Sequence, residues 1–173
     1  MAQYDVDDLL IAAGEGERKE NSDMLIKVRA DQVGGDWGMM EGTIEPLQLL
    51  TPHTHEHEDQ VVFIIEGALE FEVGGKDGLR FSAGAGAYVI KPRGVAHGFW
   101  NADPEVTVRY IELSGRDNFE KFVDSTDEGT VQASVKAKPE HGITFHVEQI
   151  PRLMKENGLT SISAMETPSI ALP

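Results

Sequence analysis

The chain of 173 residues contains no cysteine, which excludes disulfides, thiolate metal sites and a cysteine nucleophile. Basic residues are scarce, 15 against 30 acidic ones, so the net charge is −15. This balance argues against binding to nucleic acid or to an anionic membrane surface, because both attract basic faces. No apolar run approaches the length of a membrane span, and the first residues lack the pattern of a signal peptide. These absences predict a cytoplasmic enzyme or small-molecule-binding protein.

Short apolar segments separated by glycine and proline make up most of the chain, and 18 residues are glycine. Many short strands at regular spacing are typical of an all-β sandwich or barrel. The segment 61–65 is apolar at every position, which is typical of a strand buried on both faces. The predicted strands cover residues 24–29, 37–44, 61–65, 68–73, 79–81, 87–90, 95–100 and 106–113.

The two ends of the chain differ from this central part. Before the strands, the spacing of Val6, Leu9, Leu10 and Ala13 predicts a short N-terminal helix. The chain therefore divides into an N-terminal helix or arm (1–22), a barrel (23–114) and a C-terminal extension (115–173).

The C-terminal extension is expected to contain one or two helices and to pack on the barrel or on a partner subunit. Helical spacing around Phe119 predicts the first helix, and a second is expected to end at Asn157-Gly158, a good C-terminal cap. The polar stretch 124–140 between them is expected to be a long loop. The nearly uncharged residues 159–173 are expected to wrap against a partner or to be disordered.

A histidine-rich stretch, residues 52–60, lies at the centre of the chain and reads PHTHEHEDQ. Side chains two apart in a strand project to the same face, so His53 and His55 could bind one metal ion together. His57 has the same parity and is a further candidate. Imidazole is the commonest protein ligand of first-row metals, although a cluster of histidines can also be a solvated patch.

Two ordered motifs connect this stretch with a later one. The first has the form H-x-H-x4-Q-x6-G and begins at His53; the second has the form G-x5-P-x-G-x2-H-x3-N and contains His97. Together they resemble the two motifs of the cupin superfamily, a double-sheet jelly-roll barrel, over roughly residues 35 to 113. The helices expected after the barrel resemble those of quercetinase-like members of that superfamily.

The resemblance implies one divalent transition metal, Fe, Mn, Ni, Co or Zn, held by His53, His55 and His97. Gln60 stands where the family usually has a glutamate ligand. An amide is a weaker ligand than a carboxylate and has no useful basicity, so the site is expected to resemble three-histidine dioxygenase cupins and to favour anionic substrates.

Other residues near the motifs are candidates for catalysis or substrate contact. Glu58 and His57 are the nearest possible catalytic bases, although side chains in such positions are more often solvated at the barrel rim. Glu41 and Arg29 could point into the barrel, although such residues more often face solvent. Apolar side chains that could line a substrate pocket are Met40, Phe63, Tyr88 and Phe99.

These observations predict a dioxygenase-like oxidoreductase that acts on a small phenolic, enolic or hydroxy-acid substrate. Two alternatives stay open: a non-redox isomerase, cyclase or lyase that uses the metal as a Lewis acid, and a small-molecule-binding protein without catalysis. A homodimer is expected, because twofold dimers are the commonest assembly.

Overall fold

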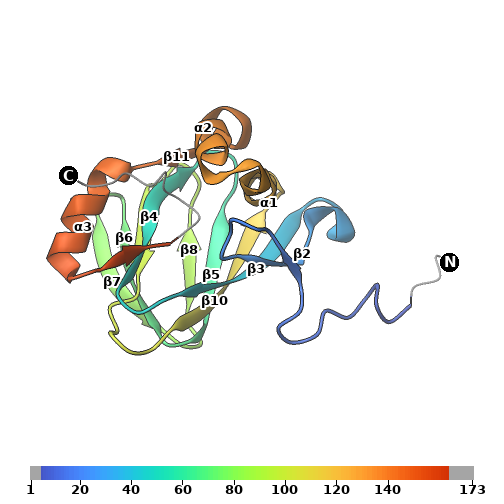
Figure 1. Cartoon of the computed structure of the whole chain (residues 1–173), viewed down its shortest axis with the longest axis horizontal. Coiled ribbons are helices and arrows are strands. Elements are labelled where there is room, and N and C mark those ends of the chain that lie inside the picture. Colours follow the sequence, from blue (N-terminus) through green and yellow to red (C-terminus); the bar gives the residue numbers. More distant parts are fainter. Residues whose placement is uncertain (1–4, 164–173) are drawn as a thin grey trace.

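The computed structural model describes residues 5–163, and its centre is a barrel of two sheets packed face to face (Figure 1). One sheet has the strand order β1-β2-β3-β10-β5-β8, and the other has the order β11-β4-β9-β6-β7 with β12 paired to β4. This is the expected all-β jelly roll, followed by C-terminal helices. The strands of the first sheet are β1 (Glu17–Arg18), β2 (Leu25–Val28), β3 (Trp37–Ile44), β10 (Val108–Gly115), β5 (Gln60–Glu66) and β8 (Tyr88–Lys91). Those of the second are β11 (Ile143–Phe145), β4 (Gln48–His55), β9 (His97–Trp100), β6 (Ala68–Val73), β7 (Leu79–Gly84) and β12 (Ser161–Ile162).

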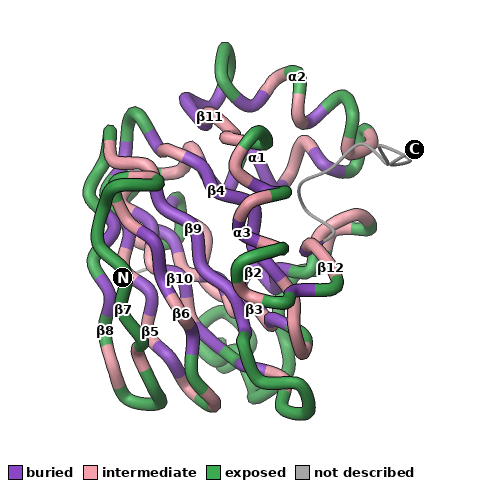
Figure 2. Tube along the Cα trace, turned by 90° about the vertical axis from the view of Figure 1, so that its left-hand side faces the viewer, coloured by how far each residue is buried: buried purple, intermediate pink, exposed green. Residues whose placement is uncertain are grey.

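The core lies between the two sheets, because alternate residues of each strand point inward. In β5 the buried positions include Val62 and Ile64, and in β10 they include Val108 and Tyr110. Phe71 and Phe99 face them from the second sheet, where their ring centroids lie 5.3 Å apart. Figure 2 shows buried residues in long purple stretches along β4 and β9, in the middle of the molecule.

Helices of the C-terminal extension cover one end of the barrel (Figure 1). Helices α1 (Asn118–Ser125) and α2 (Thr130–His141) pack on each other, and β11 then joins the edge of β4. Helix α3 (Ile150–Asn157) lies beside β6 and β7 and ends at Gly158, as predicted, in the left-handed conformation. Short 3-10 helices η1 (Ala30–Val33), η2 (Thr126–Glu128) and η3 (Val147–Gln149) complete the connections.

The structure corrects three expectations about these elements. The arm before β1 forms turns and no helix over residues 5–16. The stretch 124–140 is not a long loop, because most of it belongs to α2. Its sequence is mainly polar and contains Pro139, but Pro139 lies in the last helical turn, and Ala133 and Ala137 are small enough to allow close packing.

The third correction concerns β5, whose apolar run predicted burial on both faces. Only Gln60, Val62 and Ile64 are buried, while Val61 and Phe63 are partly exposed on the outer face. Of residues 159–173, the structure describes 159–163, where β12 pairs with β4; the rest lie outside the described residues. No helix within residues 5–163 is long and apolar enough to cross a membrane.

Candidate metal centre

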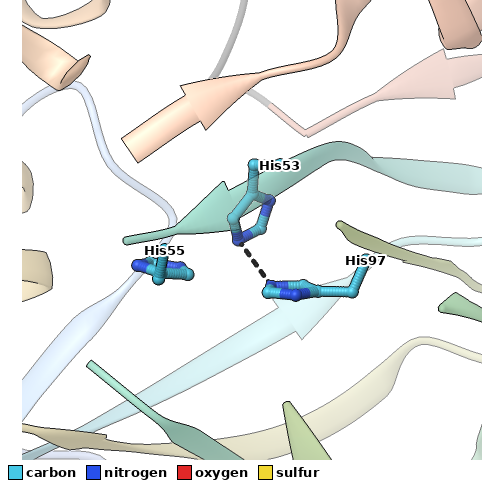
Figure 3. Close-up of side chains that lie close together, drawn as sticks. All are labelled: His53, His55 and His97. Carbon is cyan, nitrogen blue, oxygen red and sulfur yellow. Dashed lines mark hydrogen bonds between the residues drawn. The ribbon is translucent and has the colours of Figure 1, made fainter. Parts of the chain in front are cut away.

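Two adjacent strands bring three histidines together (Figure 3), beside Phe119 and Phe145 of the C-terminal extension. His53 and His55 project from β4, and His97 begins β9 as the register partner of His53. One ring nitrogen of each can be chosen so that all three lie within 4.8 Å of one another. The side chains are almost fully buried, with 2–3% exposure.

Local backbone features aim these side chains. Pro52 has no N–H to donate to a sheet, and the pairing of β4 with β9 shifts register between Leu50 and His53. Such an irregularity reorients the residues that follow it. The turn before β9 contains Gly94, whose positive φ of 75° suits glycine, and its N–H donates to the carbonyl oxygen of His55 at 2.7 Å. This bond brings the His97 segment against β4.

The hydrogen bonds of His53 and His97 define their tautomers. Nδ1 of His53 lies 2.8 Å from the carbonyl oxygen of Thr51, and Nδ1 of His97 lies 3.0 Å from that of Val95. A carbonyl oxygen only accepts, so each Nδ1 carries the ring proton, and a neutral imidazole then has a lone pair at Nε2. The two Nε2 atoms lie 3.2 Å apart, along the dashed contact in Figure 3.

Burial keeps the three rings neutral. It lowers the pKa of His53, His55 and His97 well below the usual value, and the positive charge of Lys91 lowers all three further. Two neutral rings that face each other with lone pairs are complementary to a cation. Imidazole nitrogens bind such ions at about 2.0–2.1 Å, so two ligands of one ion are about 3 Å apart. The donor set therefore fits a divalent transition metal.

Glu58 is the carboxylate nearest to the three histidines. It is 1% exposed, and its Oε1 lies 3.4 Å from Nδ1 of His55. Burial raises the pKa of Glu58 to about 7, against the opposing effect of the nearby N–H groups of Phe119 and Asn118 at the start of α1. Neither carboxylate oxygen makes a full hydrogen bond. The Glu58 side chain therefore lies against Nδ1 of His55. A carboxylate at the ring nitrogen that does not bind the metal commonly orients a metal-binding histidine.

Gln60 is also buried, at the start of β5, where its Cα partners are Lys91 of β8 and Ser114 of β10. Its Nε2 donates to Oγ of Ser114 at 2.9 Å, whereas its Oε1 is buried without a hydrogen-bond partner. An unpartnered buried amide oxygen is costly. Gln60 therefore has an acceptor available for an ion, a water molecule or a substrate.

Other candidate residues are placed away from the three histidines. His57 is exposed, and its ring lies against Gly142 rather than with His53 and His55. Tyr88 is 71% exposed, and its ring centroid lies 4.6 Å from that of the partly exposed Phe63, with the two rings tilted by 38°. Both residues therefore lie on the outer face of the sheet and cannot line the barrel interior. Met40 and Phe99 are buried inside the barrel.

Glu41 and Arg29 do not point into the barrel either. Glu41 forms an ion pair with Arg109 at 2.7 Å on the outer face of the first sheet. Arg29 binds carboxylates outside the barrel, including Asp124 of α1 at 2.9 Å. Both residues therefore stabilise contacts between surface elements.

Sequence reasoning missed a buried ion pair beside the centre. Nζ of Lys91 lies 2.5 Å from Oε1 of Glu112, and both side chains are at most 3% exposed. Nζ also lies 5.4 Å from the ring centre of Phe99. In the sequence, Lys91 begins a Lys-Pro-Arg-Gly stretch of the kind typical of turns, but it has the same strand parity as the buried Val89, which indicates the inward face. The same alternation in β10 places Glu112 on the inward face, together with Tyr110.

Comparison with known proteins agrees with this architecture. Residues 40–114 match the family described as "Cupin domain". A protein with a double-stranded β-helix domain from Klebsiella pneumoniae subsp. pneumoniae MGH 78578 aligns with a TM-score of 0.51 and 16% identity over 84% of this chain and 96% of that chain. A predicted oxalate decarboxylase from Thermotoga maritima aligns with a TM-score of 0.54 and 17% identity over 62% of this chain and 99% of that one. At these identities the likeness concerns the fold alone. No curated protein matches the chain significantly.

Proposed function

We infer that the chain is a member of the cupin superfamily, because residues 40–114 match a cupin domain and the described part of the chain forms one barrel of that fold. The three buried histidines lie on β4 and β9, and His55 and His53 contact Phe119 and Phe145 of the C-terminal extension. Because the cupin fold hosts many chemistries, function has to be argued from the site.

We propose that the protein is a metal-dependent oxidoreductase of the dioxygenase type, acting on a small phenolic, enolic or hydroxy-acid substrate. The observation that carries the proposal is the pair of facing Nε2 lone pairs of His53 and His97, with His55 beside them. When bound, a divalent metal such as Fe, Mn, Ni, Co or Zn would polarise a substrate oxygen, and a redox-active one could also activate O2.

The residues around the histidines support an anionic substrate. Three neutral imidazoles leave the full charge of a divalent ion uncompensated, and the positive charge of Lys91, which lowers the pKa of each ring, is paired with Glu112 so that the two add no net charge. Gln60 adds a neutral oxygen instead of the negative charge of a carboxylate. A phenolate, enolate or carboxylate is therefore favoured over a neutral ligand.

Two roles follow for the remaining polar and aromatic groups of the site. Glu58 orients His55 through Nδ1 in this proposal, as carboxylates commonly do for metal-binding histidines. Phe119 of α1 packs on His55 with ring centres 5.3 Å apart, and Phe145 of β11 lies 6.1 Å from His53. These rings exclude water from the site, which strengthens electrostatic interactions within it.

The test is metal-dependent O2 consumption. The purified protein is freed of metal, reloaded separately with Fe(II), Mn(II), Co(II), Ni(II) or Zn(II), and assayed in an oxygen electrode against a panel of phenols, enols and hydroxy acids. We expect turnover with at least one redox-active ion and its loss in His53→Ala. His57→Ala is the matched control, because this histidine is exposed and outside the cluster. Absence of O2 consumption with every ion would refute the oxygenase proposal.

The same panel under anaerobic conditions examines the non-redox alternative. Substrate conversion that persists without O2 and with Zn(II) would identify an isomerase, cyclase or lyase instead. Tight binding of a panel compound without conversion in either atmosphere would identify a binding protein.

A further inference from the structure

Four polar side chains lie together on the inner face of the first sheet. Gln60 of β5 is the Cα partner of Lys91 on β8 and of Ser114 on β10. Glu112 precedes Ser114 by two positions and therefore shares its face of β10. We call these four residues the polar wall, and none of them is more than 4% exposed. The large core cluster of the barrel is otherwise built from apolar side chains, so this concentration of polar groups calls for a physical reason.

Lys91 reaches from the polar wall toward the strand that carries His97. Its Nζ lies 5.4 Å from the ring centre of Phe99. Phe99 follows His97 by two positions on β9, so the two side chains share a face of that strand. The ammonium group therefore lies between the two sheets, near the candidate metal centre. The electrostatics agree with this position, because the charge of Lys91 lowers the pKa of all three histidines.

Stability does not account for the burial of Lys91 and Glu112. In a buried ion pair, the cost of taking both ions out of water nearly cancels their attraction, and apolar replacements are often as stable. The pair also keeps hydrogen-bonding capacity. An ammonium has three N–H donors, and the contact with Oε1 of Glu112 uses one of them. Each carboxylate oxygen has two lone pairs, so Glu112 can accept a further hydrogen bond inside the barrel.

A hydroxyl is the group that fits this remaining capacity. It can accept a hydrogen bond from Nζ of Lys91 and donate one to Glu112 at the same time. The pair carries no net charge, so a carboxylate or an ammonium placed against it would leave one buried charge without compensation, which is costly. Oε1 of Gln60, which is buried without a hydrogen-bond partner on the adjacent strand, provides an additional acceptor.

We propose that Lys91 and Glu112 form a subsite for a hydroxyl group of the substrate, beside the oxygen that the metal binds. This inference rests on the proposed function, because it concerns a second group of the substrate held at the histidines. Sheets stacked face to face are about 10 Å apart, so a small molecule bound at the second sheet reaches the polar wall of the first. The subsite favours phenols, enols or hydroxy acids that carry a further, protonated hydroxyl over those that lack one.

Calorimetry with ligands that differ by one hydroxyl tests the subsite. Protein loaded with Zn(II) is titrated under nitrogen with lactate and with glycerate, and with salicylate and its ring-hydroxylated derivatives. We expect the ligand with the additional hydroxyl to bind at least about tenfold more tightly in at least one comparison, because hydrogen bonds to charged groups are strong. Equal affinities in every comparison, or no binding of any of these ligands, would overturn the proposal.

Variants of the pair show whether this gain in affinity arises at Lys91 and Glu112. The double variant Lys91→Met, Glu112→Leu removes both charges together, and we expect it to bind the simpler ligand as before and to lose the gain. The double variant Lys91→Gln, Glu112→Gln keeps a donor and an acceptor, and we expect a smaller gain than in the original protein. It also decides the test if the apolar variant does not fold. A full gain in the Gln variant and in any folded apolar variant would overturn the subsite.

The matched control is Arg109→Met, Glu41→Leu, which removes an ion pair on the outer face of the same sheet and should keep the full gain. The titrations require neither O2 nor turnover, so their outcome is separate from that of the oxygen electrode. O2 consumption together with an unchanged gain in the variants of the pair would refute the subsite and leave the proposed function standing. A gain that is lost with the pair, in a protein that consumes no O2 with any ion, would support the subsite and refute the oxygenase proposal.

Discussion

Replacing only one member of the Lys91–Glu112 pair is expected to destabilise the barrel far more than replacing both. The two charges lie 2.5 Å apart in a place where neither side chain is more than 3% exposed. At an effective dielectric constant of about 20, their attraction is about 6–7 kcal/mol. Transfer of each ion from water costs several kcal/mol, so attraction and desolvation nearly cancel.

The titration of Glu112 agrees with this balance. Burial raises the pKa of the Glu112 carboxyl, and the opposing attraction of Lys91 does not bring it back to its usual value. The charged form of the carboxylate is therefore less favourable in the folded protein than in the unfolded chain. A pair with this property contributes little net stability, although each charge needs the other.

The variants Glu112→Leu and Lys91→Met each leave one buried group without its partner, and we expect each to lower the free energy of unfolding by about 3–5 kcal/mol. The double variant Lys91→Met, Glu112→Leu replaces the pair with apolar side chains. We expect its stability to equal that of the original protein or to exceed it by about 1–4 kcal/mol. The physical reason is that the double variant loses the attraction and both desolvation costs together.

Urea unfolding, monitored by circular dichroism, measures these free energies. The slope of free energy against urea concentration must be the same in all four proteins for the values to be compared. The four proteins form a double-mutant cycle, and we expect a coupling energy of about 3 kcal/mol or more. If the single variants each cost less than about 1 kcal/mol and their effects add, then water reaches the pair and the reasoning from its burial is wrong.

Three further predictions concern the metal centre and the attachment of α3. His53→Ala is expected to abolish stoichiometric binding of Ni(II) or Co(II) in calorimetry, while His57→Ala retains it; equal losses would show that the cluster is not the binding site. Gln60→Glu is expected to raise metal affinity by about 10–100-fold if its unpartnered oxygen faces the ion, and an unchanged affinity would place that oxygen elsewhere. Burial raises the pKa of Glu72, but its ion pairs with Arg152 of α3 and with Arg80 outweigh this and lower it overall. The contribution of the ionised Glu72 to stability is therefore complete above the usual carboxyl pKa of about 4.3, and it is lost as pH falls through the lower pKa of the folded state. Glu72→Gln should lower the free energy of unfolding by about 3 kcal/mol at pH 7. The stability of this variant should also fall less at acidic pH than that of the original protein, and identical pH profiles of stability would contradict the assignment.

The sequence alone predicted the barrel and the elements that carry its histidines. Strand positions follow from local alternation and from glycine and proline turns, which depend on few neighbours. His53 and His55 share a face because the strand repeat is two residues. The spacing around His97 resembled a known motif, and the structure then placed this residue beside His53.

Only the tertiary structure decided which side of each strand faces the core. The apolar run of β5 has no polar alternation, so its sequence could not show that Phe63 lies outside while Gln60 lies inside. Glu58 likewise follows β4 in a loop, and its burial beside His55 results from the later packing of α1. The helix in residues 130–141 is similar, because its small buried alanines become informative only against a neighbouring helix.

Local pattern thus determined the strands and the first two histidines, since both depend on backbone geometry over a few residues. Contacts between distant strands decided the rest. Lys91 and Glu112 are 21 positions apart in sequence, and only the barrel brings their charges within 2.5 Å. The outward placement of Phe63, Tyr88 and Ile90 likewise depends on the register of β5 and β8, because a shift of one residue would turn these side chains into the core.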